Sequence, residues 1–430
     1  MNGPKIAFQT LGCKLNFSET SDMSRKFRDN GYKIVAYKDE FDYFVLNSCT
    51  VTKQADKKCR AAIRQAHKRN PKAFLVVTGC FSQLKADELI IMDGVEIVLG
   101  NAEKPDILKY IGEHIISKNK IIAVEAGKSI NSFYPSYSFG DRTRSFLKIQ
   151  DGCDYFCSYC IIPTVRGRSR SDTIANTVKN VTEVAKTSIK EIILTGVNIG
   201  DFGRNNNESF LELITELDKI HGIERFRISS IEPDLLNDDI IKFIPQSDKF
   251  LPHFHIPLQS GSDVILKAMN RKYKREVFYD RVAKIKTAMP NACIAADIIV
   301  GFPGETDRDF VDTFEFLKRV DVSYVHVFSY SERPGTNAAK LENKVPTEII
   351  KSRSKSLHEL STKKKLEFYR NNIMQKCRVL FESNVDDGYI YGFTENYIRV
   401  KTPYRQDLIN NIITVKLLDL DEKNIIFVNQ

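Results

Sequence analysis

The chain has 430 residues, a length that fits two or three domains better than one. It contains no run of eighteen apolar residues and no signal-peptide pattern, so we expect neither a membrane span nor secretion. We therefore expect a cytoplasmic protein whose nine cysteines are thiols or metal ligands rather than disulfides. The net charge of +9 favours an anionic partner.

Strands and helices alternate over the first hundred residues, which predicts a parallel sheet. We expect strands at 5–12, 33–37, 42–48, 73–79 and 95–100. A helix is predicted over 16–31, capped by Asn16 or Ser18 and stopped by Gly31, and a basic helix over 53–70. The pattern indicates a flavodoxin-like, doubly wound sheet of order 2-1-3-4-5.

Three cysteines occupy matching places in this pattern. Cys13 follows the first strand, Cys49 the third and Cys80 the fourth. In the predicted order these strands are neighbours, about 4.8 Å apart, and ligands bind beyond their carboxyl ends. The three thiols could therefore converge on one object the size of an iron–sulfur cluster. The alternative is that each cysteine packs as a small hydrophobic residue, as we expect for Cys59, Cys293 and Cys377.

A second group of cysteines lies in the stretch DGCDYFCSYCIIP. Cys153, Cys157 and Cys160 fall within eight residues, directly after a strand predicted at 144–150. A structural zinc site needs four ligands, usually from paired motifs, and no second pair lies nearby in the sequence. A four-iron cluster held by three thiolates keeps one iron open for chemistry, which this spacing favours over zinc.

Further strands follow at helix-sized intervals, which predicts a partial (βα)6 barrel. Including the strand before the triplet, we expect six, with the later ones at 191–196, 225–230, 253–257, 294–300 and 324–329. In such a barrel the chemistry lies on the loops after the strands. Those loops are unusual in sequence, and four of the five contain glycine, the exception being the second: GVNIGDFG, SSIEPD, PLQSGSD, GFPGETD and SYSERPGT. Glycines there would let a ligand approach the backbone closely.

The end of the chain changes character. A basic amphipathic helix is predicted over 351–372, packed on the barrel, and short strands follow from about Cys377. About fifty residues of short strands indicate a small β-barrel of oligonucleotide-binding type. Aromatic and cationic residues alternate there: Tyr389, Tyr391, Phe393, Tyr397, Tyr404, Arg399, Lys401 and Arg405. They fit either a stacking surface for bases or a barrel core with a charged exterior.

These motifs together resemble one family, the radical S-adenosylmethionine methylthiotransferases. The resemblance is carried in order by TLGCKLN, NSCTVT, TGC, DGCDYFCSYCIIP, HIPLQSGSD, GFPGET and SERPGT, and it covers essentially the whole chain. TLGCKLN is most similar to the threonylcarbamoyladenosine tRNA branch. By their position at the end of the chain, the last strands resemble the TRAM domain with which members of this family end.

The resemblance implies two four-iron clusters. Cys153, Cys157 and Cys160 would bind the radical-generating cluster, whose open iron takes the amino and carboxylate groups of S-adenosylmethionine and cleaves it to a 5′-deoxyadenosyl radical. Cys13, Cys49 and Cys80 would bind an auxiliary cluster that carries the sulfur to be donated. One S-adenosylmethionine methylates that sulfur, and the other provides the radical that removes hydrogen from carbon 2 of adenine.

Beyond the clusters, the sequence provides binding candidates but assigns no catalytic residue. Candidates for the S-adenosylmethionine pocket follow the second, third and fourth barrel strands: Thr195, Gly196, Asn198, Ser230, Glu232, Gln259 and Ser260. Each could equally be a turn or cap residue. Asp297 and Glu305 are further candidates, and the alternative is that they are simply carboxylates of a strand end or a helix start. Arg166, Arg168 and Arg170 could meet phosphate or form a solvated face.

We therefore expect an N-terminal methylthiotransferase domain over 1–115, a linker over 116–140, a radical S-adenosylmethionine domain over 141–370 and a TRAM-like domain over 371–430. The expected reaction methylthiolates carbon 2 of N6-threonylcarbamoyladenosine at position 37 of tRNA. Alternatives are isopentenyladenosine in tRNA, an aspartate of a ribosomal protein, or a non-catalytic RNA-binding protein with structural clusters. Expected partners are the anticodon stem-loop and an electron donor such as flavodoxin or ferredoxin, and we expect a monomer.

Overall fold

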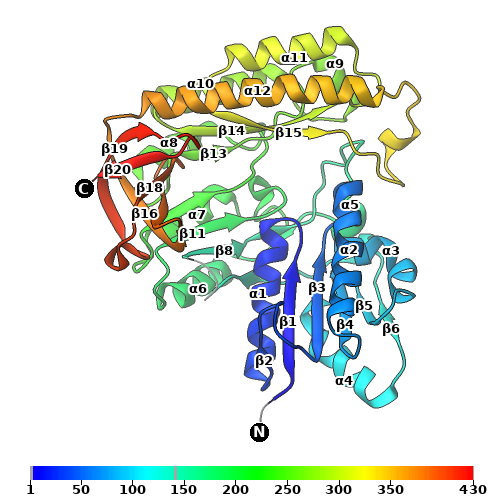
Figure 1. Ribbon diagram of the computed structural model, residues 1–430. Coiled ribbons are helices and arrows are strands. Elements are labelled where there is room, and N and C mark those ends of the chain that lie inside the picture. The colour runs from blue at the N-terminus through cyan, green and yellow to red at the C-terminus, as the bar shows by residue number, and fades with distance from the viewer. Residues whose placement is uncertain (1–2, 140–142, 430) are drawn as a thin grey trace. The chain divides into compact units, whose positions relative to one another are not determined.

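The computed structural model describes residues 3–139 and 143–429, which divide into two compact units (Figure 1). The first unit contains residues 3–138, 146–172 and 331–339. The second contains the remaining described residues, most of them in 173–330 and 340–429. The predicted boundary between residues 140 and 141 lies outside the described residues, and the other predicted domain boundaries stay predictions. Among the described helices, none combines the length and apolar character that crossing a bilayer requires.

The first unit is built on a six-stranded parallel sheet of order β2-β1-β3-β4-β5-β6. Its strands are β1 (Lys5–Thr10), β2 (Lys33–Ile34), β3 (Tyr43–Ser48), β4 (Phe74–Gly79), β5 (Val95–Leu99) and β6 (Ile121–Ala123). Its helices are α1 (Lys14–Asp29), α2 (Lys53–Arg69), α3 (Cys80–Ile90) and α4 (Ile107–Ser117). The predicted flavodoxin-like order is confirmed, although β2 is shorter than predicted.

Side chains that alternate along the central strands pack into two separate hydrophobic cores, one on each face of the sheet. Phe44 and Leu46 of β3 pack with α2 and α3, while Tyr43 and Val45 pack with α1 and α4. Because strands buried on both faces read as continuous apolar runs, the sequence YFVL fits this doubly covered position. Helices on both faces leave the strand ends as the open edge at which a ligand can bind.

Helix α1 begins earlier than predicted. Its N-cap is Cys13, so the predicted caps Asn16 and Ser18 were wrong. Both residues are buried inside the first turns, where the Asn16 side-chain amide donates to the carbonyls of Leu11 (2.8 Å) and Ser48 (2.9 Å). The predicted stop is confirmed, since the helix ends at Asp29 and Gly31 takes a left-handed φ of +84°.

The first unit also contains the segment around the second cysteine group. The remaining short elements of the first unit, within and before this segment, are η1 (Lys104–Asp106), η2 (Gly127–Ser129), β7 (Ser136–Tyr137), β9 (Gln150–Asp151), α5 (Ile162–Arg166) and β10 (Arg170–Ser171). Strand β8 (Arg144–Lys148) leads into it, as predicted for the strand before the triplet. Both cysteine groups thus belong to one compact unit.

The second unit contains the other five barrel strands, all parallel neighbours in chain order. They are β11 (Glu191–Thr195), β12 (Arg225–Ile228), β13 (His253–His255), β14 (Cys293–Val300) and β15 (Tyr324–Ser329). The intervening helices are α6 (Ile174–Ala185), α7 (Phe210–Asp218), α8 (Asp238–Phe243), α9 (Asp263–Ala268), α10 (Arg275–Ala288) and α11 (Asp307–Arg319). The predicted strand–helix alternation is confirmed.

The predicted basic helix is α12 (Thr347–Asn371), which lies along β15 and β14 (Figure 1). Ser361 anchors it, because its hydroxyl accepts from the Val325 amide (2.9 Å) and donates to the Val325 carbonyl (2.8 Å). The helix leads into a closed barrel, which confirms the predicted small β-barrel, and its five strands have the order β16-β17-β18-β20-β19. The strands are β16 (Lys376–Asp386), β17 (Tyr389–Thr394), β18 (Arg399–Pro403), β19 (Ile412–Leu420) and β20 (Ile426–Asn429).

Candidate iron–sulfur and radical site

The sheet brings Cys13, Cys49 and Cys80 to one edge. Cys49 directly follows β3, Cys80 begins α3 directly after β4, and Cys13 caps α1 after β1. Since β1, β3 and β4 are adjacent strands, the predicted placement of the three cysteines after neighbouring strands is confirmed, and their role as cluster ligands stays a prediction. We call these residues the auxiliary triplet. Burial raises the pKa of the Cys49 thiol to about 12, so its deprotonation requires a compensating positive charge such as a metal.

Two local features bring the loops together. Gly12 has a φ of +105°, and a Cβ there would lie 2.7 Å from the Cys49 Cβ. Only glycine lets the loop before α1 pass this close to Cys49. Cys59, predicted to be structural, lies in α2 with no exposed surface and donates its thiol to the Cys49 carbonyl at 3.3 Å. It therefore supports the triplet's backbone.

Cys153, Cys157 and Cys160, which we call the radical triplet, lie on the loop between β9 and α5. The Tyr155 amide donates to Cys153 Sγ at 3.4 Å, and the Cys153 amide donates to the Gly167 carbonyl at 3.1 Å. Amide donors to sulfur are one of the means by which proteins tune iron–sulfur clusters. At Gly152, with φ of +69°, a Cβ would lie 1.9 Å from the Arg168 carbonyl oxygen, so the loop turns only with glycine there.

A cavity of about 650 Å³ lies beside the radical triplet. Its lining includes Cys157, Cys160, Gly127, Lys128, Thr336 and Asn337. This volume is within the range of pockets that hold a ligand of cofactor size. The region 124–128 was predicted only as linker, and no sequence signal placed it at this site.

A buried set of ion pairs joins the surroundings of the two triplets; we call it the Glu19 network. It consists of Glu19, Lys104, Lys148, Asp151, Arg166 and Arg170, none of whose side chains is more than 9% exposed. Glu19 lies in α1 and pairs with Lys104 (2.5 Å), Lys148 (2.9 Å) and Arg166 (3.1 Å). Asp151, two residues before Cys153, pairs with Lys148 (2.7 Å), Arg166 (2.9 Å) and Arg170 (3.2 Å).

The carboxylates of this network stay ionised despite their burial. Burial alone would raise the pKa of Glu19, but Arg166, Lys104 and Lys148 hold it well below its usual value. The same balance lowers the pKa of Asp151, where Arg166, Lys148 and Arg170 outweigh the effect of burial. Buried charges that are paired and hydrogen-bonded in this way fix the geometry of the elements that contribute them.

Arg166 fits neither of the two roles that the sequence suggested, a phosphate contact or part of a solvated face. It ends α5 with only 1% of its surface exposed, and Arg170 is also buried, so neither a phosphate contact nor a solvated face describes them. Arg168 alone is exposed, with its guanidinium 4.6 Å from the Phe156 ring centroid. The sequence could not reveal this, because the partner Glu19 lies 147 residues away.

Three further contacts link the surroundings of the two triplets. Asn101 donates to the Val165 carbonyl of α5 at 2.6 Å, and Cys80 packs against Ile161 and Val165. Arg333, in the SERPGT motif, donates to Thr50 (2.7 Å), the residue after Cys49. Three residues of that same stretch line the cavity beside the radical triplet: Gly335, Thr336 and Asn337. SERPGT was one of the motifs that carry the family resemblance, but the sequence did not predict that it contacts the surroundings of both triplets.

The predicted pocket residues of the second unit lie on three neighbouring loops. Asn198 accepts from the Glu232 amide at 3.4 Å, and the Ile199 amide donates to the Ser230 carbonyl at 3.2 Å, which joins two loops. Arg271 forms an ion pair with Glu232 and donates a hydrogen bond to the Tyr273 hydroxyl. That hydroxyl in turn donates to the Pro257 carbonyl at 2.5 Å. Arg271 and Tyr273 were not predicted. Burial raises the pKa of Glu232 to about 7, opposed by Arg271.

The remaining candidates are placed less distinctively. Thr195 is buried at the end of β11 and donates to the Ile193 carbonyl (3.1 Å), and partly buried Gly196 follows it. Gln259 has a φ of +68° after β13. Ser260 is fully buried, with its hydroxyl 3.2 Å from that of Thr313. The three loops are brought together, but their roles toward S-adenosylmethionine stay predictions.

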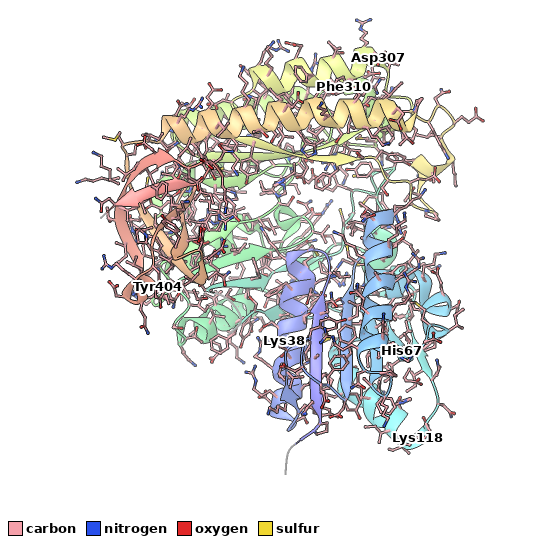
Figure 2. The ribbon with its side chains drawn as sticks, viewed as in Figure 1. Lys38, His67, Lys118, Asp307, Phe310 and Tyr404 are labelled. Atoms are coloured by element: carbon pink, nitrogen blue, oxygen red, sulfur yellow. The ribbon has the colours of Figure 1, made fainter. Side chains whose placement is uncertain are left out.

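The two carboxylates left open by the sequence have different partners. Glu305 accepts from the Gly301 amide and from Arg353 of α12, both at 2.7 Å, so it is structural. Arg353 also pairs with Asp307 and lies over the Phe310 ring, two residues labelled at the start of α11 in Figure 2. Asp297 instead lies in mid-strand, 2.7 Å from His255 Nε2.

Comparisons with known proteins agree with this geometry. Residues 147–317 match the Radical SAM superfamily, and residues 5–100 match a family described as uncharacterized protein family UPF0004. The first match begins just before the radical triplet, and the second contains the whole auxiliary triplet.

Relatives match over nearly the full length. The threonylcarbamoyladenosine tRNA methylthiotransferase MtaB of Aquifex aeolicus is 40% identical, covering 92% of this chain and 96% of the relative. The protein of the same name from Bacillus subtilis is 38% identical over 96% and 93%. A tRNA-2-methylthio-N(6)-dimethylallyladenosine synthase of Clostridium tetani is 35% identical over 95% and 92%.

Among solved structures, the radical S-adenosylmethionine methyltransferase TsrM of Kitasatospora setae aligns with a TM-score of 0.57. The alignment covers 78% of this chain and 77% of that one, at 13% identity, and it shows a shared fold. With relatives of 35–40% identity over more than nine-tenths of its length, the chain belongs to the radical S-adenosylmethionine methylthiotransferase family and is an enzyme of that class.

Proposed function

We propose that this protein is a tRNA methylthiotransferase that modifies carbon 2 of N6-threonylcarbamoyladenosine at position 37, using two four-iron clusters and S-adenosylmethionine. The observation that carries the proposal is the placement of both cysteine triplets in one compact unit, joined by the Glu19 network. The names of the relatives support tRNA as the substrate and threonylcarbamoyladenosine as the nucleoside.

The residues fit the proposed cofactors. The auxiliary triplet offers three thiols from loops at one edge of the sheet, and the radical triplet offers three from a single loop that borders a cavity of about 650 Å³. Three protein thiolates leave one iron of a four-iron cluster open, which a radical enzyme uses to bind S-adenosylmethionine. When bound, the clusters and S-adenosylmethionine supply the methyl group, the sulfur and the radical chemistry.

The protein's own residues have two tasks in this proposal. The Glu19 network and Arg333 hold the triplet-bearing loops in a fixed geometry. Cys157, Cys160 and the segments around Gly127 and Thr336 line the cavity beside the radical triplet. We propose Asn198, Glu232 and their loop neighbours as polar contacts for S-adenosylmethionine.

Anaerobic reconstitution followed by iron analysis tests the two-cluster proposal. We expect about eight irons per chain, and about four after Cys153, Cys157 and Cys160 are all replaced by alanine. The variant in which Cys13, Cys49 and Cys80 are replaced should also keep about four irons but retain reductive cleavage of S-adenosylmethionine. Replacing Cys293 and Cys377 together is the matched control and should leave the count unchanged. Zinc in place of iron would contradict the proposal.

The similarity to the dimethylallyladenosine synthase of Clostridium tetani supports isopentenyladenosine as a second candidate substrate. Mass spectrometry of tRNA nucleosides from a strain without the gene distinguishes the candidates. Loss of the methylthio group from threonylcarbamoyladenosine supports the first proposal, and loss from isopentenyladenosine supports the second. Unchanged levels of both would point away from tRNA.

A further inference from the structure

The Glu19 network has an imbalance of charge. It contains four cations, Lys104, Lys148, Arg166 and Arg170, but only two carboxylates, Glu19 and Asp151. The excess is therefore two positive charges within one buried cluster. Buried charge is costly unless an opposite charge compensates it, so the cluster is suited to an anionic group beside it.

The auxiliary triplet is where that anionic group would lie. Arg166 directly follows Val165, which packs against Cys80, and Lys104 lies three residues after Asn101, whose side-chain nitrogen is 4.0 Å from Cys80 Sγ. Arg166 also donates to Asn16 at 2.6 Å, and Asn16 in turn binds the carbonyls of Leu11 and Ser48, which flank Cys13 and Cys49. The net positive charge of the Glu19 network therefore lies beside the auxiliary triplet.

A four-iron cluster on three thiolates is anionic, and it becomes more so when it is reduced. Neighbouring positive charge stabilises the reduced form more strongly and raises the reduction potential. We infer that the Glu19 network sets the potential of the auxiliary cluster, with Lys104 and Arg166 as positioning residues that favour its reduced state. This inference rests on the proposed function, since it requires a cluster at the auxiliary triplet.

Two substitutions separate this role from a structural one. Lys104→Met and Glu19→Gln disrupt the same 2.5 Å ion pair, but the first removes a positive charge and the second a negative charge. A merely structural pair predicts similar effects from both variants. The electrostatic role predicts that Lys104→Met lowers the potential of the auxiliary cluster and Glu19→Gln raises it.

The measurement is an EPR-monitored redox titration of the reconstituted full-length enzyme. Replacing the radical triplet with alanine identifies the auxiliary signal. At a fixed potential we expect the ratio of reduced to oxidised auxiliary cluster to fall at least tenfold in Lys104→Met, a shift of about 59 mV, and to rise in Glu19→Gln. Lys109→Met is the matched control, because the exposed Lys109–Glu113 pair of α4 is outside the network.

The outcomes are distinct from those of the two-cluster proposal. Wild-type protein with only four irons would refute the proposed function itself. Eight irons with unchanged potentials in both variants, or with shifts of the same sign, would overturn this inference alone. If Lys104→Met does not retain its cluster, Lys148→Met removes a different cation of the network and must lower the potential instead.

A separate observation in the second unit points to a metal site. His255, Asp297 and His326 offer ligand atoms that all lie within 4.8 Å of one another. They come from the adjacent strands β13, β14 and β15, where Asp297 is the register partner of His326 and His255 that of Ala295. Because residues two apart share a face, all three side chains lie on one face of the sheet. The opposite face carries the buried Phe254, Ile294 and Ile298.

We propose that these three residues bind a divalent transition-metal ion. Two imidazoles and one carboxylate form a donor set that suits zinc or ferrous iron and leaves coordination positions open. His255 and Asp297 are partly buried and His326 is exposed, so an ion can reach the site.

Zinc titration of the fully iron-loaded enzyme, followed by removal of unbound metal and elemental analysis, tests this site. We expect about one zinc per chain, bound at least tenfold more weakly in Asp297→Asn and in His326→Ala. His358→Ala, an exposed histidine of α12, is the control and should bind normally. Iron content must stay constant throughout. No bound zinc in the wild type, or equal affinity in Asp297→Asn, would overturn the proposal.

Discussion

Arg166 donates a 2.6 Å hydrogen bond to Asn16, across 150 residues of sequence. Asn16 lies three residues after Cys13, and Arg166 lies six residues after Cys160. The bond therefore connects the helix that starts at one triplet with the helix that follows the other. Any change in the position of one helix is transmitted to the loop that holds the other set of thiols.

Removing the Arg166 cation should destabilise the first unit. Arg166→Met leaves Glu19 and Asp151 each without one buried partner, and breaking such a pair typically costs about 3–5 kcal/mol. We expect a lower melting temperature and loss of iron after reconstitution. Arg168→Met is the control from the same loop, since 65% of that side chain is exposed, and it should keep its iron. Equal behaviour of the two variants would contradict this account.

Gly12 should be required for the auxiliary triplet alone. In Gly12→Ala the new Cβ would lie 2.7 Å from the Cys49 Cβ, on a backbone with φ of +105°. If the protein holds the two proposed four-iron clusters, we expect about four of their eight irons to be lost. In the matched variant Gly112→Ala no heavy atom lies within 4 Å of the new Cβ, so α4 should become slightly more stable. Full iron content in Gly12→Ala would show that the loop can rearrange.

Glu232 should make stability depend on pH. Its folded pKa of about 7 exceeds the ordinary 4.5, so the folded state holds a proton that the unfolded state has released. Stability should therefore fall as the pH rises from about 4.5 to 7, and then stay level. Glu232→Gln cannot ionise and should show a flatter dependence of melting temperature on pH. The control Glu224→Gln, at an exposed pair with Lys190, should keep the wild-type slope.

Tyr404 is the aromatic residue of the C-terminal barrel best placed to stack on RNA. It is 45% exposed and is labelled beside that barrel in Figure 2, whereas Tyr391 is buried and Lys401 pairs with Asp421. Stacking of a base on an aromatic ring contributes about 1–3 kcal/mol. Tyr404→Ala should therefore weaken tRNA binding about fivefold or more, measured by filter binding. Tyr279 on α10 is also exposed, at 53%, and Tyr279→Ala should leave tRNA binding unchanged.

Much of the fold follows from local sequence patterns. Continuous apolar runs such as that around Val45 predicted the buried parallel strands, and glycine at position 31 predicted the end of α1. The positions of the cysteines after their strands could also be predicted, because strand order and strand ends are properties of the alternating pattern.

The connections between distant segments could not be predicted in this way. Asparagine is a residue type that often caps helices, but the Asn16 side-chain amide instead donates hydrogen bonds to carbonyls of two neighbouring loops. Arg166 and Arg170 lie in a basic stretch that looks solvated, and their burial depends on carboxylates supplied by Glu19 and Asp151. The partners of a buried charge are fixed by tertiary packing, which a local pattern does not encode.

The most direct test of the central claim is a reaction with defined RNA. The reconstituted enzyme is incubated anaerobically with S-adenosylmethionine, a reductant and a sulfide source, on anticodon stem-loops that carry either threonylcarbamoyladenosine or isopentenyladenosine. Mass spectrometry should find the 2-methylthio product on the threonylcarbamoyladenosine RNA, together with 5′-deoxyadenosine, and no product on the other. Product on the isopentenyladenosine RNA alone, or 5′-deoxyadenosine without any modified RNA, would contradict the account.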